Sequence, residues 1–365
     1  MGKENFIMER KHYLDNIRSF TVLSVMIYHC AYVFNGLGVL GGFADNEGFW
    51  LTDGFCTLIY PFFMVLLFCI SGIAARHSIE KRGVKTFIKE RVTKLIVPST
   101  LGCLVLHWIS GFINVKISGG LEFIPPFLIY PISVLSGTGP LWFAQLLFVY
   151  CLFCKLFVKL NNSKFDLMCK KTNCPVLILI SVLIWGSSQI FNMPIVVVYR
   201  FGIYFISFSI GYFILYHEEV MDRVKKMLPL TLPMSIIMAV VYMLMYFGDN
   251  YTNDSVLKSP ITNFYLWITI LAIFGFSQRY MNKTNRVLKH LRKNSFGLYV
   301  LHYLPIMTFG YMLNYYTSLS SGLCILFILV IDFTVTPVIN FLLKKIPFIR
   351  YAVLGIKRGK NEIQT

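Results

Sequence analysis

The chain has 365 residues, of which 56% are hydrophobic and only 14% are charged. Soluble domains carry about 25% charged residues, so this composition excludes an ordinary soluble protein and predicts apolar spans of about 20 residues joined by short loops. The formal net charge of +17 does not indicate nucleic-acid binding, because the basic residues lie in short loops between apolar segments, where they determine topology.

Apolar segments long enough to span a membrane follow one another along the chain. They lie at 19–40, 55–75, 95–115, 139–160, 175–191, 196–216, 228–247, 260–278, 296–316 and 321–343. With the N-terminus inside, nearly all of the 34 Lys and Arg fall in inner segments, and only Lys116 and Lys258 fall in outer loops. We therefore predict an all-α, multi-pass bundle of about ten transmembrane helices over residues 1–350, with both ends in the cytoplasm and a cytoplasmic tail at 351–365.

The first span contains ionisable residues, which are costly in lipid and are therefore functional candidates. Arg18 and His29 are eleven residues apart. That spacing is about three helical turns and about 16 Å, so both side chains lie on one face, Arg18 near the inner surface and His29 near the middle of the bilayer. Asp15 precedes Arg18 by three residues and is placed to pair with it. A neutral histidine can act as a general base, and helix packing is the alternative role for His29.

A basic segment leads into the third span. Its apolar positions recur every three to four residues and its basic positions occupy other faces: Val84, Phe87, Ile88, Val92 and Leu95 against Lys85, Lys89, Arg91 and Lys94. This pattern predicts an amphipathic helix on the inner membrane surface that enters the span at Pro98. Binding to anionic lipid and binding to an anionic ligand are both open roles for it.

Later spans contain further ionisable residues, namely His107, Arg200, His302 and Asp332. Arg200 and Asp332 are either functional or a buried ion pair with a structural role. His302 lies about two turns into its span, where supporting another residue, contacting an acceptor and packing are all open. Cys151 and Cys154 form a CxxC motif inside an apolar helix, so we interpret them as packing residues and predict neither a disulfide framework nor a metal site.

Several short motifs occur in order along most of the chain. They are Tyr13-Leu-Asp-Asn-Ile-Arg18 followed by Val-Met-Ile-Tyr-His29, Pro61-Phe-Phe-Met through Ser71-Gly72, Lys89-Glu-Arg91-Val-Thr-Lys94-Leu-Ile-Val-Pro98, Pro140-Leu-Trp142-Phe143, and Ser295-Phe-Gly-Leu-Tyr299-Val-Leu-His302. Together they resemble the membrane-bound acyltransferase 3 family. The resemblance implies a ten-helix integral enzyme that moves an acyl group, often acetyl, from cytoplasmic acyl-CoA to an extracytoplasmic acceptor such as a surface glycan.

The resemblance also implies roles for residues at the donor end. His29 matches the expected catalytic histidine, and Arg18 matches an arginine that is also implicated, with Asp15 beside it. The family's Arg-x-x-Arg motif is associated with the acyl donor and appears here as Arg91 and Lys94. A lysine still supplies a point charge for phosphate but loses the bidentate geometry of arginine. We therefore expect Arg91 and Lys94 to bind acyl-CoA, with acetyl-CoA as the default donor.

The acceptor end is expected to involve Trp142, Tyr299 and His302, in contact with a glycan or a lipid-linked sugar. Stacking on a sugar ring is one role for Trp142, and a place in the interfacial aromatic belt is the alternative. Helix packing is the equal alternative for Tyr299 and His302. The expected protein is an O-acyltransferase in contact with membrane lipid, in a bacterial cytoplasmic membrane, with no metal and no nucleic-acid partner.

Other functional classes remain alternatives at this point. A transporter or flippase of a glycan or lipid intermediate also suits many spans with buried charges, although the Gly/Pro-interrupted spans in symmetric halves that typify transporters are not evident. A membrane scaffold for glycan assembly is the third class. Basic residues that lead to a buried histidine favour a donor channel, so acyl transfer is the predicted function. The identity of the acyl group, the acceptor and the oligomeric state are left open.

Overall fold

The structure is a computed structural model that describes residues 11–43, 47–193 and 199–357. Within these residues it consists of helices and short loops, and a bridge between Asn192 and Arg200 is the only strand-like pairing. The predicted all-α class is therefore confirmed. The helices are α1 (His12–Tyr32), α2 (Trp50–Arg82), α3 (Val84–Arg91), α4 (Val97–Gly102), α5 (Trp108–Ile117), α6 (Pro126–Ser136), α7 (Trp142–Leu160), α8 (Ser163–Lys170), α9 (Cys174–Ser188), α10 (Phe201–Phe213), α11 (Glu218–Lys226), α12 (Leu228–Tyr246), α13 (Asp254–Leu257), α14 (Pro260–Tyr280), α15 (Arg286–Leu301), α16 (Tyr303–Tyr316), α17 (Ser321–Leu343) and α18 (Pro347–Leu354).

Six helical segments in the described part of the chain are long and apolar enough to cross a membrane, and up to eight if two bent helix pairs each count as one span. The bent pairs are α8 with α9, at 104°, and α15 with α16, at 50°. Two of the predicted spans lie outside this count and fall on α1 and α10. Helix α1 contains Asp15, Arg18 and His29, which lower its hydropathy, and α10 has only 13 residues. A multi-pass protein is therefore established, and the number ten stays a prediction.

The third predicted span begins earlier than expected. Residues Val84–Ile117 form one long helical segment, in which π-helical turns at Val92–Ile96 and Cys103–His107 separate α3, α4 and α5. Pro98 lies inside this segment, where the irregular turn before it accommodates the missing backbone donor. Phe87 and Leu95 are buried against α2 and α7. The apolar face of the amphipathic segment thus packs on the bundle, and its place at the inner membrane surface stays a prediction.

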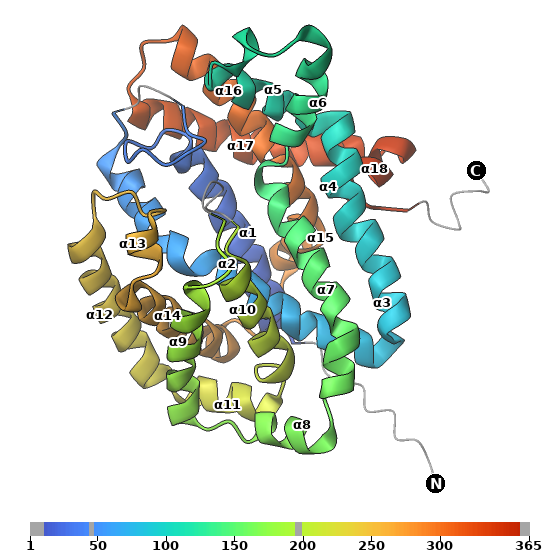
Figure 1. Cartoon of the computed structure of the whole chain (residues 1–365), viewed down its shortest axis with the longest axis vertical. Coiled ribbons are helices and arrows are strands. Elements are labelled where there is room, and N and C mark those ends of the chain that lie inside the picture. The colour runs from blue at the N-terminus through green and yellow to red at the C-terminus, as the bar shows by residue number, and fades with distance from the viewer. Residues whose placement is uncertain (1–10, 44–46, 194–198, 358–365) are drawn as a thin grey trace.

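Helix α2 is central to the bundle. It packs most extensively against α10 and also contacts α1, α3, α7, α12 and α14. In Figure 1, α9, α12 and α14 lie on one side of it and α3, α4 and α7 on the other. A Cβ on Gly72 would lie 2.1 Å from the carbonyl oxygen of Phe208, and one on Gly211 would lie 2.1 Å from the carbonyl oxygen of Cys69. The two helices therefore approach this closely only because both contact positions lack a side chain.

Helix α18 ends the described part of the chain and is not an isolated tail. It packs against α4, and its residues Ala352, Val353 and Leu354 are buried. Residues 351–354 of the segment predicted as a cytoplasmic tail therefore form part of a packed helix.

Candidate active site

A cavity of about 970 Å³ opens between α1, α2, α3, α7 and α15. We call it the basic cavity, because five cationic side chains line it: Lys11, Arg18, Lys81, Arg82 and Arg91. Asp15 and Glu80 are the acidic residues on the same lining. An excess of cations in a cavity of this size is the arrangement that binds a polyanion.

The cations of the basic cavity differ in their partners. Lys11 pairs with Glu218, and Arg82 pairs with Glu90 at 2.7 Å. Arg18 interacts electrostatically with Asp15, whereas neither Lys81 nor Arg91 has an ion pair in the part of the chain that the structure describes. The Arg91 guanidinium carbon lies 4.8 Å from the centre of the Phe87 ring, and its Nε atom is buried without a hydrogen-bond partner. An orphaned buried donor beside a cavity is available to a ligand.

The two residues predicted beside Arg18 and Arg91 lie differently. Asp15 lines the basic cavity, where its charge interacts with that of Arg18 as expected, and its Oδ2 atom also lies 3.3 Å from Nη1 of Arg292 on α15, a partner that the sequence does not indicate. Lys94 is exposed but is not on the cavity lining. Arg91 therefore lies in the cavity and Lys94 does not. Lys81 and Arg82 also line the cavity and were not predicted, because only their position after the second span indicates a role for them.

A second cavity, of about 840 Å³, lies between α1, α2, α7 and the start of α16. His29 lines it, and we call it the histidine cavity. Nine further lining residues are aromatic: Tyr28, Tyr32, Tyr60, Phe63, Trp142, Tyr199, Tyr204, Tyr299 and Tyr303. Such a lining offers flat apolar faces together with hydroxyl groups. Most of these tyrosines were not predicted, because nothing in a single sequence distinguishes a tyrosine that lines a cavity from one that packs.

Trp142 is a lining residue of the histidine cavity and not an exposed belt residue. Its side chain is 8% exposed, and its ring centre lies 5.5 Å from that of Tyr204 and 5.9 Å from that of Tyr199. The burial excludes the interfacial-belt alternative for Trp142.

His29 is held by contacts to one of its two ring nitrogens. Nδ1 lies 2.8 Å from the backbone oxygen of Val25 and 3.3 Å from Nε2 of His302. The edges of the Tyr28 and Tyr303 rings pack against the imidazole, with ring centres 5.2 and 5.4 Å away. The second nitrogen, Nε2, is the one left for a molecule in the histidine cavity.

His302 lies behind His29 rather than on the lining of either cavity. It is fully buried at the bend between α15 and α16, and its Nδ1 atom lies 2.8 Å from the backbone oxygen of Tyr299. His107 is also buried, and its Nε2 atom has no hydrogen-bond partner among the described residues.

Tyr299 connects the two cavities. Among the described residues it is the only one that lines both of them. Its hydroxyl donates a hydrogen bond to the backbone oxygen of Pro140, and its ring centre lies 5.9 Å from that of Phe143. The sequence predicts a single passage from the basic cluster to His29; the structure has two cavities instead, and they meet at this side chain.

The predicted pair of Arg200 and Asp332 is wrong. Arg200 donates through Nη2 to the backbone oxygen of Leu257 at 3.2 Å. Asp332 accepts hydrogen bonds from Thr336 at 2.5 Å and, more weakly, from Cys30 at 3.9 Å. Arg200 lies immediately before α10 and Asp332 lies on α17, and each has different partners, which sequence spacing alone does not reveal.

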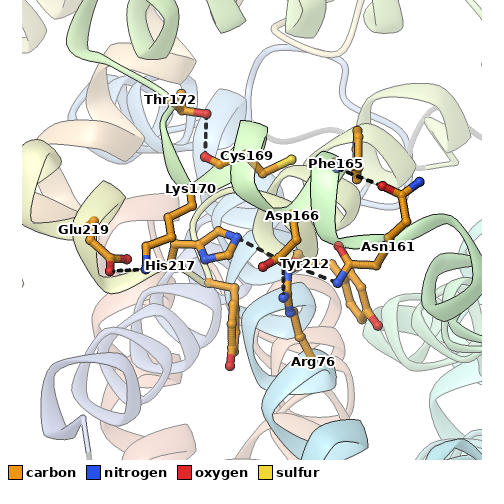
Figure 2. Close-up of polar contacts among 12 residues, drawn as sticks. Arg76, Asn161, Phe165, Asp166, Cys169, Lys170, Thr172, Tyr212, His217 and Glu219 are labelled. Atoms are coloured by element: carbon orange, nitrogen blue, oxygen red, sulfur yellow. Dashed lines mark hydrogen bonds and ion pairs between the residues drawn. The ribbon is translucent and has the colours of Figure 1, made fainter.

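A separate group of charges ties α2 to α8 and α11 (Figure 2), and among its members only Glu80 also lines the basic cavity. We call it the ion-pair network; its members are Arg76, Glu80, Asp166, Lys170, His217 and Glu219. Nη2 of Arg76 lies 2.5 Å from Oδ1 of Asp166, and its Nε lies 3.1 Å from Glu80. His217 Nε2 lies 3.5 Å from the same Asp166 oxygen, and burial together with the Arg76 charge lowers the pKa of His217.

Comparison with known proteins gives one match. A family model described as an acyltransferase domain matches residues 11–339, a stretch that contains every predicted site residue. Neither a search of the curated proteins nor a search of the solved structures found a match.

Proposed function

Because the chain belongs to the acyltransferase 3 family of membrane acyltransferases, we propose that it transfers an acyl group, acetyl by default, from cytoplasmic acyl-CoA to a hydroxyl of an extracytoplasmic glycan. In this proposal His29 is the general base. The observation that carries it is the pair of cavities that meet at Tyr299, one lined by cations and the other by aromatic rings and His29.

The basic cavity suits the donor. Coenzyme A is polyanionic, and the cavity is lined by Arg18, Lys81 and Arg91, of which Lys81 and Arg91 have no ion pair among the described residues. Cationic side chains hold phosphate oxygens through charge-assisted hydrogen bonds, and arginine does so with two parallel bonds. The wall toward Tyr299 is apolar and contains Leu67, Phe143 and Leu147, which suits the less polar pantetheine arm.

The histidine cavity suits the acceptor. Sugar rings present apolar faces that stack on aromatic side chains and hydroxyls that need hydrogen-bond partners. Trp142 supplies a large ring, and Tyr28 and Tyr303 bring hydroxyl-bearing rings next to His29. An acceptor hydroxyl in this cavity would meet the free Nε2 atom of His29.

The chemistry follows from that contact. Nε2 of His29 takes the proton of the acceptor hydroxyl while the hydroxyl oxygen attacks the thioester carbonyl carbon. The new carbon–oxygen bond replaces the carbon–sulfur bond, and the departing thiolate takes the proton from His29. The products are the ester and free coenzyme A, and His29 returns to its neutral form without an added cofactor.

Tyr299 stands where donor and acceptor must meet. Its ring lies between the basic cavity and the histidine cavity, and its hydroxyl is bonded to Pro140. A rotation of this side chain would bring the thioester within reach of His29, and the rest of the donor would remain in the basic cavity.

The test uses the purified full-length chain in lipid vesicles with labelled acetyl-CoA and candidate surface glycans. Label should appear on the glycan with the wild-type protein and be lost with His29→Ala, at equal protein abundance. His107→Leu is the matched control, since it also removes a buried histidine side chain. Full transfer by His29→Ala would end the assignment of the base. Movement of glycan across the bilayer without acylation would identify a transporter instead.

A further inference from the structure

We propose that His302 is a positioning residue that sets the tautomer and the ring orientation of His29. The proposal rests on the proposed function in that His29 is taken as the base. It is carried by the hydrogen-bond geometry of two buried imidazoles on different helices, α1 and the α15–α16 bend.

The first step concerns the proton of His29. Nδ1 lies 2.8 Å from the backbone oxygen of Val25, and a carbonyl oxygen can only accept. This contact is a hydrogen bond only when Nδ1 carries the hydrogen. A neutral imidazole has one N–H, so Nε2 of His29 then holds a lone pair. That nitrogen is the one that a general base needs.

The second step concerns the proton of His302. Its Nδ1 atom lies 2.8 Å from the backbone oxygen of Tyr299 and 3.2 Å from that of Leu298, and both oxygens are acceptors. Nδ1 of His302 is therefore protonated, and its Nε2 atom is an acceptor. That Nε2 atom lies 3.3 Å from Nδ1 of His29. The N–H of His29 thus points at an acceptor on His302 as well as at Val25.

The third step concerns what surrounds the pair. His302 is 0% exposed, and the rings that face it are His29, Tyr299 and Tyr303, with His107 near enough to interact electrostatically. Because His302 lines neither cavity, it acts through His29 and not on a substrate. Its position at a helix bend, between packed aromatic rings, leaves it little freedom to rotate.

The pair resembles the base and its orienting partner in a catalytic triad, with an imidazole in place of the carboxylate. When Nε2 of His29 takes up a proton, the positive ring keeps an acceptor for its Nδ1 hydrogen. A carboxylate would serve the same purpose, but its charge would be costly in the interior of a membrane protein. A neutral acceptor avoids that cost.

The tautomer can be measured without any assay of acyl transfer. In wild-type protein in lipid, with ¹⁵N-labelled histidine, the nitrogen shifts of His29 should report a protonated Nδ1 and an unprotonated Nε2. The chain has only seven histidines, so the His29→Gln variant assigns the signal. His302→Leu should give a mixture of tautomers. A proton on Nε2 in the wild type, or unchanged populations in His302→Leu, would overturn the proposal even if acyl transfer is confirmed.

Kinetics supply the second readout. His302→Leu should lower kcat by roughly 10- to 100-fold. This loss is a part of the rate gain of about 10²- to 10⁴-fold that a positioned general base contributes. The KM values for acyl-CoA and for the acceptor should stay within about 3-fold of wild type. His302→Gln keeps an acceptor at the same reach and should recover most of kcat. His217→Leu removes another buried histidine that lines neither cavity, and its kcat should stay within about 3-fold of wild type. Equal losses in the Leu and Gln variants, or a loss confined to KM, would contradict a positioning role. If the Leu variant does not accumulate, the wild-type tautomer and the Gln variant still decide the question.

Discussion

The ion-pair network and the basic cavity both contain arginines on the inner half of the molecule, and they differ in the partners of those arginines. In the network, Arg76 contacts the carboxylates of Asp166 and Glu80 at 2.5 and 3.1 Å. In the cavity, Arg91 has no ion pair among the described residues and its Nε atom lacks a hydrogen-bond partner, while Arg18 shares Asp15 with Arg292. A cation with carboxylate partners stabilises the fold, whereas a cation without them is available to an anionic ligand. The comparison shows that partners, rather than position in a basic segment, separate the two roles.

The largest expected effect comes from removing two arginines of the basic cavity. Arg18→Ala combined with Arg91→Ala should raise the KM for acyl-CoA by about 100-fold, because each charge-assisted contact is worth about 1.5 kcal/mol or more. The midpoint of thermal unfolding should fall less than in Arg76→Ala, because Arg18 interacts with the single carboxylate of Asp15, which also lies 3.3 Å from Arg292. Titration of the initial rate with acyl-CoA, beside a thermal scan, measures both. A donor KM within about 2-fold of wild type would show that the cavity does not hold the donor.

For the ion-pair network we expect a loss of stability and no change in the donor KM. Arg76→Ala leaves Asp166 and Glu80 without their cation and should destabilise the protein by about 2 kcal/mol, a figure reduced because both carboxylates are partly exposed. Thermal unfolding in detergent measures the loss, and the donor KM should be unchanged. Lys170→Ala is the comparison variant, because it breaks an exposed ion pair with Glu219 in the same network, lines neither cavity and should leave both stability and donor KM nearly unchanged. A change in donor KM without a loss of stability would place Arg76 in the donor site.

A smaller effect is expected from the pH dependence of the network. The pKa of His217 is lowered in the fold by burial and by Arg76, so the unfolded chain takes up a proton at higher pH than the folded chain. The stability that His217 contributes is therefore complete above its unfolded pKa of about 6.5 and is lost as the pH falls through the lower folded value. In wild type the unfolding midpoint should drop between about pH 6.5 and pH 5 more than it does in His217→Gln. Parallel pH curves for the two proteins would contradict this account.

The smallest effect is expected at Lys94. It is exposed and is not on the lining of the basic cavity, so Lys94→Ala should change the donor KM by less than about 3-fold, whereas Arg91→Ala alone should change it by about 10-fold. The two variants are matched, because each removes one charge from the same helical segment. Equal effects would show that both residues contact the donor, as the sequence analysis predicts.

Much of the bundle was predictable because long apolar segments leave a strong signal in the sequence. Helix α1 was predicted although its ionisable residues lower its mean hydropathy. Asp15, Arg18 and His29 in an otherwise apolar segment themselves indicate a functional span. The continuous segment 84–117 was not predicted in full. Its π-helical turns and its packing against α2 and α7 depend on tertiary contacts that periodicity does not report.

The candidate site was predictable in part. His29, Arg91 and Trp142 line the two cavities, as their motifs indicate. Lys94 does not line the basic cavity, because a π-helical turn at Val92–Ile96 follows Arg91. This wider turn rotates Lys94, three residues after Arg91, away from the helical face that Arg91 occupies. The division of the passage into two cavities at Tyr299 was not predicted, because a single sequence indicates neither the volume of a cavity nor where a side chain divides it.

The position of Tyr299 between the two cavities also affects the permeability of the membrane. A water-filled passage running from one face of the bilayer to the other would let ions leak and would dissipate the gradients that a cell maintains. Tyr299, whose hydroxyl donates a hydrogen bond to the backbone oxygen of Pro140, lines both cavities and stands between them. In the proposed function this side chain would keep the donor and acceptor cavities from forming one continuous pore, and Tyr299→Ala would be expected to leak ions.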